Sequence, residues 1–382
     1  MEIRLYRPPE TGDVNFIPVG ITNAAKSIRY KESFYSYGDF EITIPTGAYG
    51  AAAFEKYLLA YIDRRFWGLI LDIGYALDDS GDNMTVTGVC IKGMTGARFT
   101  MPPGFTYEQV GGTAGYDVAN GSTETCMKHF MTSNFFNPNS PTRSVPGLVI
   151  APDQGRGNPA DYYMTRFALL STVLEDLGKA AKIGYSITPV LTTGEFVFDV
   201  VEGADRSAEQ SVNPRIVFEV RRGNIERMEY QDSDRNMKNV FYATLSGAKY
   251  EDEAYTATIT RDGGALPSGL RRWEQHLDIS ASHPIAGQEF NELQRLTLIQ
   301  AQSYETVNSF SAVILDTRKK YGVDYHLGDI VTVINREWGV STHTRITAVD
   351  IDASDSGVKY TATFGDAPIN FIERLRRQIR GG

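Results

Sequence analysis

The side chains that could carry out catalysis are scattered along this chain of 382 residues. The sequence contains neither a Gly-x-Ser-x-Gly nucleophile elbow nor a His-Glu-x-x-His zinc motif. Among 47 acidic residues some carboxylates must lie close together, but no pair is marked out for glycoside hydrolysis. The residue types therefore predict no enzyme, no cofactor and no metal site. The five histidines share no ligand spacing, so we expect surface or hydrogen-bonded roles for them: His129, His276, His283, His326 and His343.

Two kinds of loop could bind a phosphate or a cation. Segment 111–115 is rich in glycine, but it lacks the Lys-Ser/Thr pair of a phosphate-binding loop. Segment 78–83 (DDSGDN) offers oxygen ligands for calcium, but their order differs from that of an EF-hand. The aspartates of segment 350–357 also do not follow the order of an EF-hand. Because Asp and Asn are ordinary turn residues, we interpret both acidic segments as hairpin turns.

The composition limits the class of protein. A net charge of −9 argues against general nucleic-acid binding, which needs a basic face. Cys90 and Cys126 lie far apart, and two free buried thiols are expected rather than a disulfide. We expect no signal peptide, and no apolar run approaches the ~20 residues that span a bilayer.

The framework that must position these side chains is predicted to be mainly β. Near the C-terminal end, segment 330–334 is β-branched throughout and segment 358–364 alternates apolar and polar residues, with a third strand-like run at 342–351. Short strands of this kind can close into a small antiparallel barrel. The first hundred residues have a similar layout, with strands predicted at 3–6, 26–30, 39–44, 57–65, 67–75 and 84–92.

The middle of the chain mixes helices with strands. Segment 122–131 is a predicted helix, capped by Ser122 or Thr123, with Cys126, Met127 and Phe130 on one face. Segment 166–182 has the strongest helical periodicity, and 285–303 is a second long helix with Phe290, Leu293 and Leu296 in an apolar stripe. Other predicted elements are a long ordered loop at 133–159, a hairpin at 185–190 and 195–201, a β-rich block at 216–259, and a strand at 310–315.

These elements predict an α+β, mainly β chain with four parts. Residues 1–100 form a first β-barrel completed by 215–275, and residues 101–214 form an α+β domain completed by 276–306. Residues 307–366 form a second β-barrel, and residues 367–382 a C-terminal amphipathic helix. The apolar and basic side chains of that helix give a candidate partner interface: Ile372, Leu375, Arg377 and Ile379.

Several short segments follow one another along the chain in a characteristic order: 37–45 (YGDFEITIP), 67–70 (WGLI), 84–88 (MTVTG), 143–148 (RSVPGL), 239–242 (NVFY), 324–333 (DYHLGDIVTV), 345–347 (RIT) and 364–365 (FG). In this order they resemble a known family, the siphovirus Gp37-like tail proteins. The resemblance covers nearly the whole chain, and it extends to the baseplate hub proteins of phage tails and contractile injection machines and to the N-terminal part of tail-associated lysins.

The resemblance implies a hub-type ring subunit with two small antiparallel β-barrels joined by α+β domains. Three copies would form a homotrimer whose six barrels match the six-fold tail tube or distal tail protein above. A spike, tip or fibre protein would lie below, and DNA would only pass through. It also implies a virion tail component assembled in the host cytoplasm. The chain lacks the long C-terminal region of the lysins, so no peptidase or lysozyme activity is carried over.

Two other functions stay open on the sequence alone. One is a cell-wall hydrolase of the tail tip. The other is a carbohydrate-binding receptor module, which the many aromatic residues could serve. Buried core is, however, the usual position of aromatic side chains.

Overall fold

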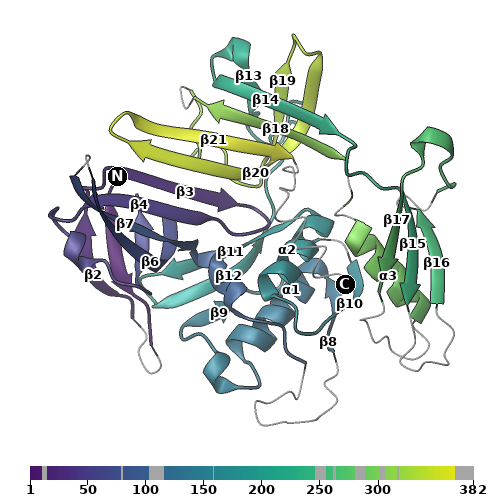
Figure 1. Ribbon diagram of the computed structural model, residues 1–382, viewed down its shortest axis with the longest axis horizontal. Helices are drawn as coiled ribbons and strands as arrows, with labels where there is room; N and C mark the ends of the chain where they lie inside the picture. The colour runs from purple at the N-terminus through teal and green to yellow at the C-terminus, as the bar shows by residue number, and fades with distance from the viewer. Residues whose placement is uncertain are drawn as a thin grey trace. The chain divides into compact units, whose positions relative to one another are not determined.

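One sheet of thirteen strands carries most of the fold (Figure 1). The computed structural model describes residues 1–10, 15–78, 81–102, 116–157, 159–245, 255–260, 264–279, 289–301, 304, 306–315 and 318–365. The strands of the sheet are β1 (Ile3–Arg7), β2 (Ile17–Thr22), β3 (Ser27–Ser33), β4 (Asp39–Pro45), β5 (Leu59–Ile62), β6 (Phe66–Asp78), β7 (Gly81–Cys90), β13 (Val217–Glu219), β14 (Ile225–Ser233), β18 (Val307–Ile314), β19 (Ile330–Asn335), β20 (Val340–Ser354) and β21 (Gly357–Gly365).

The sheet consists of two blocks of strands that meet at β3 and β20. The first block is β1 to β7, and the second is β13, β14 and β18 to β21. Because β20 is 15 residues long, its first part pairs with β19 and its second part pairs antiparallel with β3, from Ala348↔Ser33 to Ser354↔Ser27. The strands of these two blocks form one continuous sheet, and the expected pair of closed barrels is not confirmed.

The strands of the first block follow the sequence patterns closely. In β4 the inward residues Phe40, Ile42 and Ile44 are buried, as their alternation with polar residues predicts. The turn after β6 is shorter than the six residues expected, since pairing with β7 continues to Asp78↔Gly81. Strand β2 was not predicted, because Pro and Gly interrupt the alternation of its residues.

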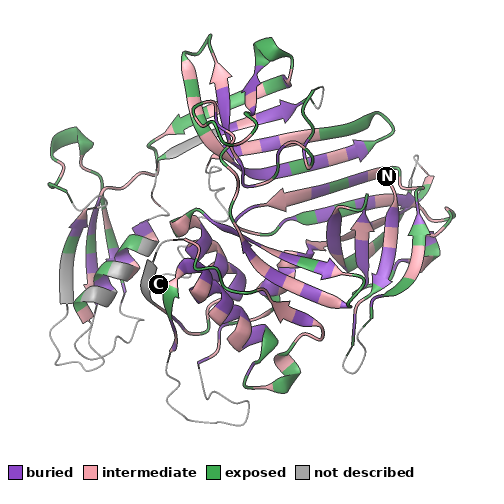
Figure 2. Ribbon diagram, turned by 180° about the vertical axis from the view of Figure 1, so that it is seen from behind, coloured by how far each residue is buried: buried purple, intermediate pink, exposed green. Residues whose placement is uncertain are grey.

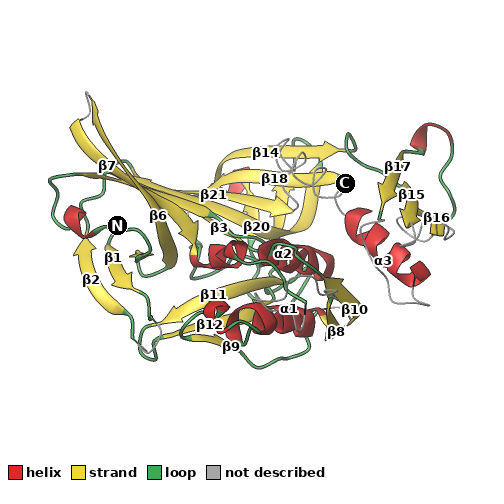
Figure 3. Cartoon of the chain, turned by 60° about the horizontal axis from the view of Figure 1, so that its bottom comes forward, coloured by secondary structure: helices red, strands yellow, loops and turns green. Residues whose placement is uncertain are grey.

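A helical layer packs against the first block. It contains α1 (Thr123–Met131), α2 (Leu170–Ala181) and two small sheets, one of β8 (Asp117–Ser122) with β10 (Pro159–Thr165), the other of β9 (Leu148–Ile150), β12 (Glu195–Val201) and β11 (Gly184–Val190). Figure 3 shows α1 and α2 side by side next to β11 and β12. One hydrophobic core joins these parts to the sheet, with Trp67 from β6, Phe130 from α1, Leu174 from α2 and Phe198 from β12, and Figure 2 shows buried positions gathered there.

In the helical layer the structure confirms one predicted helix cap and corrects a predicted helix start and a predicted loop. Ser122 caps α1, because its hydroxyl accepts a hydrogen bond from the backbone N–H of Thr125 at 3.1 Å. The second helix begins at Leu170 rather than at residue 166, since Phe167 has φ +53° and its N–H bonds to Thr100. Segment 133–159 is not a simple loop, because it contains a π-helical turn (Thr132–Phe136) and β9.

The chain divides into two compact units, one of residues 1–228 and 311–364, the other chiefly of residues 229–310. In the second unit, β15 (Val240–Leu245) lies between β16 (Tyr255–Thr260) and β17 (Glu274–Asp278), and α3 (Glu289–Ala301) packs on this sheet. Leu293 of α3 is buried against it as expected. Phe290, predicted in the same stripe, is instead 56% exposed.

Candidate functional site

A Ser–Asp–His grouping is the closest approach to a catalytic constellation that we find in the described part of the chain. Asp117 at the start of β8 is buried, with Oδ1 2.6 Å from Nε2 of His129 and Oδ2 accepting a hydrogen bond from the Ser133 hydroxyl at 2.8 Å. In a catalytic triad the histidine must contact the hydroxyl directly. Here the carboxylate lies between them, so the grouping holds α1 against β8 and does not activate the serine.

The histidines described with side-chain partners have the hydrogen-bonded roles predicted from the sequence. His343 bonds Thr332 at 2.8 Å, its Nε2 lies 3.1 Å from the Glu209 carboxylate, and His276 bonds Thr244 at 3.1 Å. Within the residues that the structure describes, no group of three or more His, Cys, Asp and Glu could hold a metal ion. His283 and the glycine-rich segment 111–115 lie outside the described residues.

A buried cluster of two acids and two bases fixes the first turn of α1. Glu124 is fully buried. Its carboxylate accepts two hydrogen bonds from the Arg156 guanidinium, at 2.8 and 2.9 Å, and one from the Arg156 backbone N–H, at 2.8 Å. Lys128 bonds Glu124 at 2.6 Å, and Asp199 of β12 accepts from both cations. Burial raises the pKa of Glu124, but the bonds from Arg156 and Lys128 outweigh it and hold that pKa well below its usual range.

Lys92 fixes the segment after β7 to the end of β3. Its ammonium donates to the carbonyls of Ser33 and Phe34 at 2.8 and 3.2 Å and lies 4.2 Å from the centre of the Tyr185 ring. Burial lowers the pKa of Lys92 to about 8. The neighbouring thiol of Cys90 is buried, which raises its pKa.

A three-residue junction holds the loop before β19 against the first block. Arg65, in the turn between β5 and β6, bonds the Glu32 carboxylate of β3 at 3.2 and 3.3 Å. Its guanidinium also donates to the Tyr321 carbonyl at 3.2 Å and lies 4.0 Å from the Tyr321 ring centre. The buried Tyr321 hydroxyl donates to Glu32. The two blocks are therefore joined by strand pairing and by a buried charged group.

Burial and the partners of this junction set its protonation. Burial together with the Glu32 carboxylate raises the pKa of the Tyr321 hydroxyl well above 10. Burial would lower the pKa of Arg65, but the same carboxylate outweighs it and raises that pKa. The junction therefore consists of an ion pair and a neutral phenol across the neutral pH range. No local sequence signal points to it, because Arg65 and Tyr321 are 256 residues apart.

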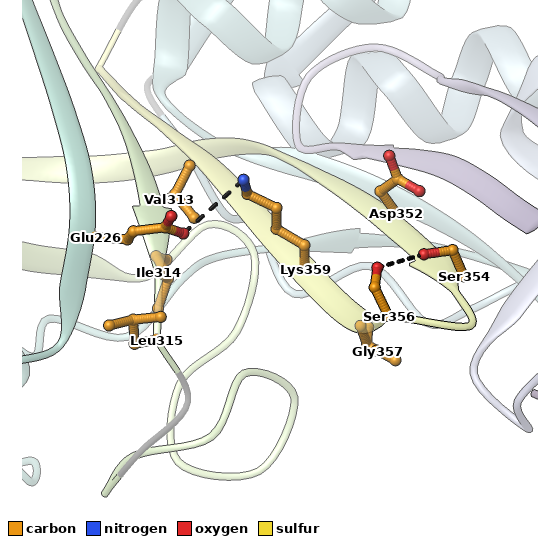
Figure 4. A pocket seen from close by; sticks show the side chains of 10 residues that line it. Glu226, Val313, Ile314, Leu315, Asp352, Ser354, Ser356, Gly357 and Lys359 are labelled. Carbon is orange, nitrogen blue, oxygen red and sulfur yellow. Dashed lines mark hydrogen bonds and ion pairs between the residues drawn. The ribbon is translucent and has the colours of Figure 1, made fainter.

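A shallow pocket of about 290 Å³ lies beside the β20–β21 hairpin (Figure 4). Its polar lining pairs Lys359 with Glu226 at 3.8 Å and Ser354 with Ser356 at 2.7 Å. Asp352 in its wall forms an ion pair with Arg29. These partners compensate one another, so the pocket presents no unpaired catalytic acid or base.

The two cysteines, the membrane prediction and the candidate interface residues are the other positions singled out in the sequence. Cys90 and Cys126 are both free and buried, which confirms the prediction of two thiols, and burial raises the pKa of Cys126 to about 11. None of the described helices is long and apolar enough to cross a membrane. The four candidate interface residues lie outside the described residues: Ile372, Leu375, Arg377 and Ile379.

Two solved structures with a similar fold are tail proteins. The prophage MuSo2 43 kDa tail protein from Shewanella oneidensis is 12% identical, with a TM-score of 0.53 over 95% of this chain and 98% of the other. The tail protein from Neisseria meningitidis MC58 is 13% identical, with a TM-score of 0.53 over 97% of this chain and 98% of the other. No curated protein sequence matched the chain significantly.

The fold is thus a mainly β architecture shared with tail proteins of bacteriophages. Residues 3–366 match the model of the Siphovirus ReqiPepy6 Gp37-like protein family, and the chain belongs to that family. Family and fold together define a phage tail-type protein, as the resemblance in the sequence predicted.

Proposed function

We propose that the chain is a structural, non-enzymatic hub subunit at the end of a phage tail. Three copies form a ring that adapts a six-fold tail tube, or its distal tail protein, to a three-fold spike, tip or fibre protein. DNA only passes through the ring, and the ring becomes part of the virion tail after assembly in the host cytoplasm. The family and the fold support this proposal.

One observation carries the ring in particular. Each chain supplies two strand blocks, joined by β3 and β20 and fixed by the Glu32–Arg65–Tyr321 junction. Three chains would therefore bring six blocks to one annulus, which matches six-fold symmetry above and three-fold symmetry below. In this proposal each block is a small barrel within the ring, residues 1–100 belong to the first and 307–366 to the second, and the α+β parts lie between them.

The C-terminal segment 367–382 completes the proposal as an amphipathic helix at the junction with the tip protein. Its apolar residues would face the partner, and the neighbouring arginine would contact partner carboxylates. These positions are Ile372, Leu375, Ile379 and Arg377.

Mass photometry of the purified protein, followed by electron microscopy with and without tube protein, tests the hub. We expect trimers or rings that attach to tube ends. A strict monomer at micromolar concentration, with no association with tube protein, would count decisively against the proposal. Zymography on peptidoglycan separates the hub from the hydrolase alternative, since a hub produces no clearing.

A further inference from the structure

The hairpin of β6 and β7 carries an apolar face that stays exposed among the described residues. Beyond a bulge at Leu71, the side chains of Ile73, Tyr75 and Leu77 point to one face. Tyr75 is 71% exposed and Leu77 81% exposed, and Figure 3 shows this hairpin extending past the neighbouring strands. Clustered apolar side chains at such exposure indicate a binding surface.

This part of β6 also has a free edge. β5 pairs with β6 only from Phe66 to Leu69, whereas pairing with β7 continues to Asp78, so no described strand covers the outer edge beyond Leu71. The segment carries no Lys and no Pro, the residues that commonly protect an edge strand from pairing. We call this surface, residues 71–78 with their β7 partners, the hairpin arm.

The arm is acidic. The sequence from Leu71 to Thr87 contains four aspartates and neither Lys nor Arg, and Asp72 and Asp82 are exposed. A partner surface that suits the arm must therefore combine apolar side chains with positive charge.

The second block has such a surface. Val220 and Trp338 are 51% and 50% exposed, and Arg221 is exposed beside Val220 in the turn after β13. β13 and β19 are neighbours in parallel register, so this turn and the β19–β20 turn lie at the same end of the sheet. Arg and Trp are among the residues that contribute most to protein interfaces.

One buried carboxylate holds this surface together. The Glu219 carboxylate forms an ion pair with Arg336 of the β19–β20 turn at 2.7 Å and another with Arg222 of the turn after β13 at 3.3 Å. The two turns are thereby fixed together, and their three arginines exceed the two acids Glu219 and Glu337, so the apolar surface keeps a small excess of positive charge. We call it the tryptophan patch, and it consists of Val220, Arg221, Arg222, Arg336 and Trp338.

We propose that the hairpin arm of one copy binds the tryptophan patch of a second copy of this chain. Apolar faces and opposite charges match, and the two surfaces lie on different blocks of the same unit. A contact between two different surfaces is head-to-tail, and it closes a ring when the rotation from one copy to the next returns to the first copy, as the proposed three-fold ring requires. The inference rests on the proposed ring function and names the surfaces by which its copies associate.

Complementary variants test the proposal. An arm variant carries Tyr75→Glu and Leu77→Glu, and a patch variant carries Arg221→Glu and Trp338→Glu. Each keeps one intact surface, so each should be monomeric, with self-association weakened ~30-fold or more. Mixed in equal amounts, they should form a 1:1 heterodimer and nothing larger, because only one productive contact remains. Tyr49→Glu, at a tyrosine that is 79% exposed, is the matched control and should leave the trimer intact.

The outcomes separate this inference from the hub proposal. Trimers that persist in both variants, or a mixture that stays monomeric, would overturn the arm–patch contact and leave the hub standing. A wild-type chain that is monomeric with and without tube protein would overturn both. Formation of the heterodimer in sedimentation or mass photometry also proves that both variants fold.

Discussion

Replacing Arg65 with methionine is expected to uncouple the two strand blocks. The substitution leaves the Glu32 carboxylate, whose side chain is 18% exposed, with only the Tyr321 hydroxyl among the partners described here. Breaking a buried pair by removing one partner costs about 3–5 kcal/mol, and the partial exposure here lowers the expected loss to about 2–3 kcal/mol. Tyr321→Phe removes a hydrogen bond to a charged group and should cost about 2 kcal/mol.

The three tryptophans provide the assay. Trp67 reports on the first block, Trp338 on the second and Trp273 on the second unit. In single-tryptophan backgrounds, urea unfolding followed at Trp67 and at Trp338 should coincide with the native junction. In Arg65→Met the two transitions should separate, because the second block loses its buried anchor.

A matched control tests whether the effect belongs to the junction. Arg29 of β3 forms an ion pair with Asp352 of β20 at 3.3 Å, so this pair also links the two blocks, but both side chains are about half exposed or more. Arg29→Met should therefore cost less than ~1 kcal/mol. If Arg65→Met shifts the unfolding midpoint no further than Arg29→Met, and the two transitions still coincide, the reasoning is refuted.

Three further predictions follow from groups with shifted pKa. The pKa of Glu124 is lowered in the fold, so its carboxylate stabilises the protein at pH values above 4.5, its ordinary pKa, and this contribution is lost as the pH falls below 4.5. The difference in urea midpoint between wild type and Glu124→Gln should therefore shrink from pH 5 to pH 3. Lys92, whose pKa is lowered to about 8, contributes stability that grows as pH rises from 8 to 10.5, so the stability of the wild type relative to Lys92→Met should rise over this range; a constant difference would contradict this. Both buried thiols should react with a thiol reagent only after unfolding, and rapid labelling of Cys126 in the native protein would disprove its burial.

Local patterns in the sequence were sufficient for elements whose burial follows a fixed period. The alternation in β4 and the Ser122 cap of α1 are examples, since each depends on residues within one strand or one turn. The family was also recognisable, because the order of short segments survives where no single motif is decisive.

Predictions failed where a distant part of the chain decides the local structure. The bond from Phe167 to Thr100 delays the start of α2, and β9 exists because β12 is available beside it. Phe290 has helical spacing toward the stripe of Leu293 but is exposed. Periodicity shows that a face is apolar, and it does not show how far the neighbouring sheet extends.

The sequence by itself determined the mainly β character, helices α1 to α3 to within a few residues of their ends, most strands of the first block, the two thiols and the family. Only the tertiary structure decided that β20 joins two blocks into one sheet, and that Glu32, Arg65 and Tyr321 form one buried group. Strand pairing depends on hydrogen bonds between backbones, which all residue types share, so pairing across 300 residues leaves no trace in local composition. The free edge of the hairpin arm follows from the same pairing, because an edge exists only once every neighbouring strand has its place.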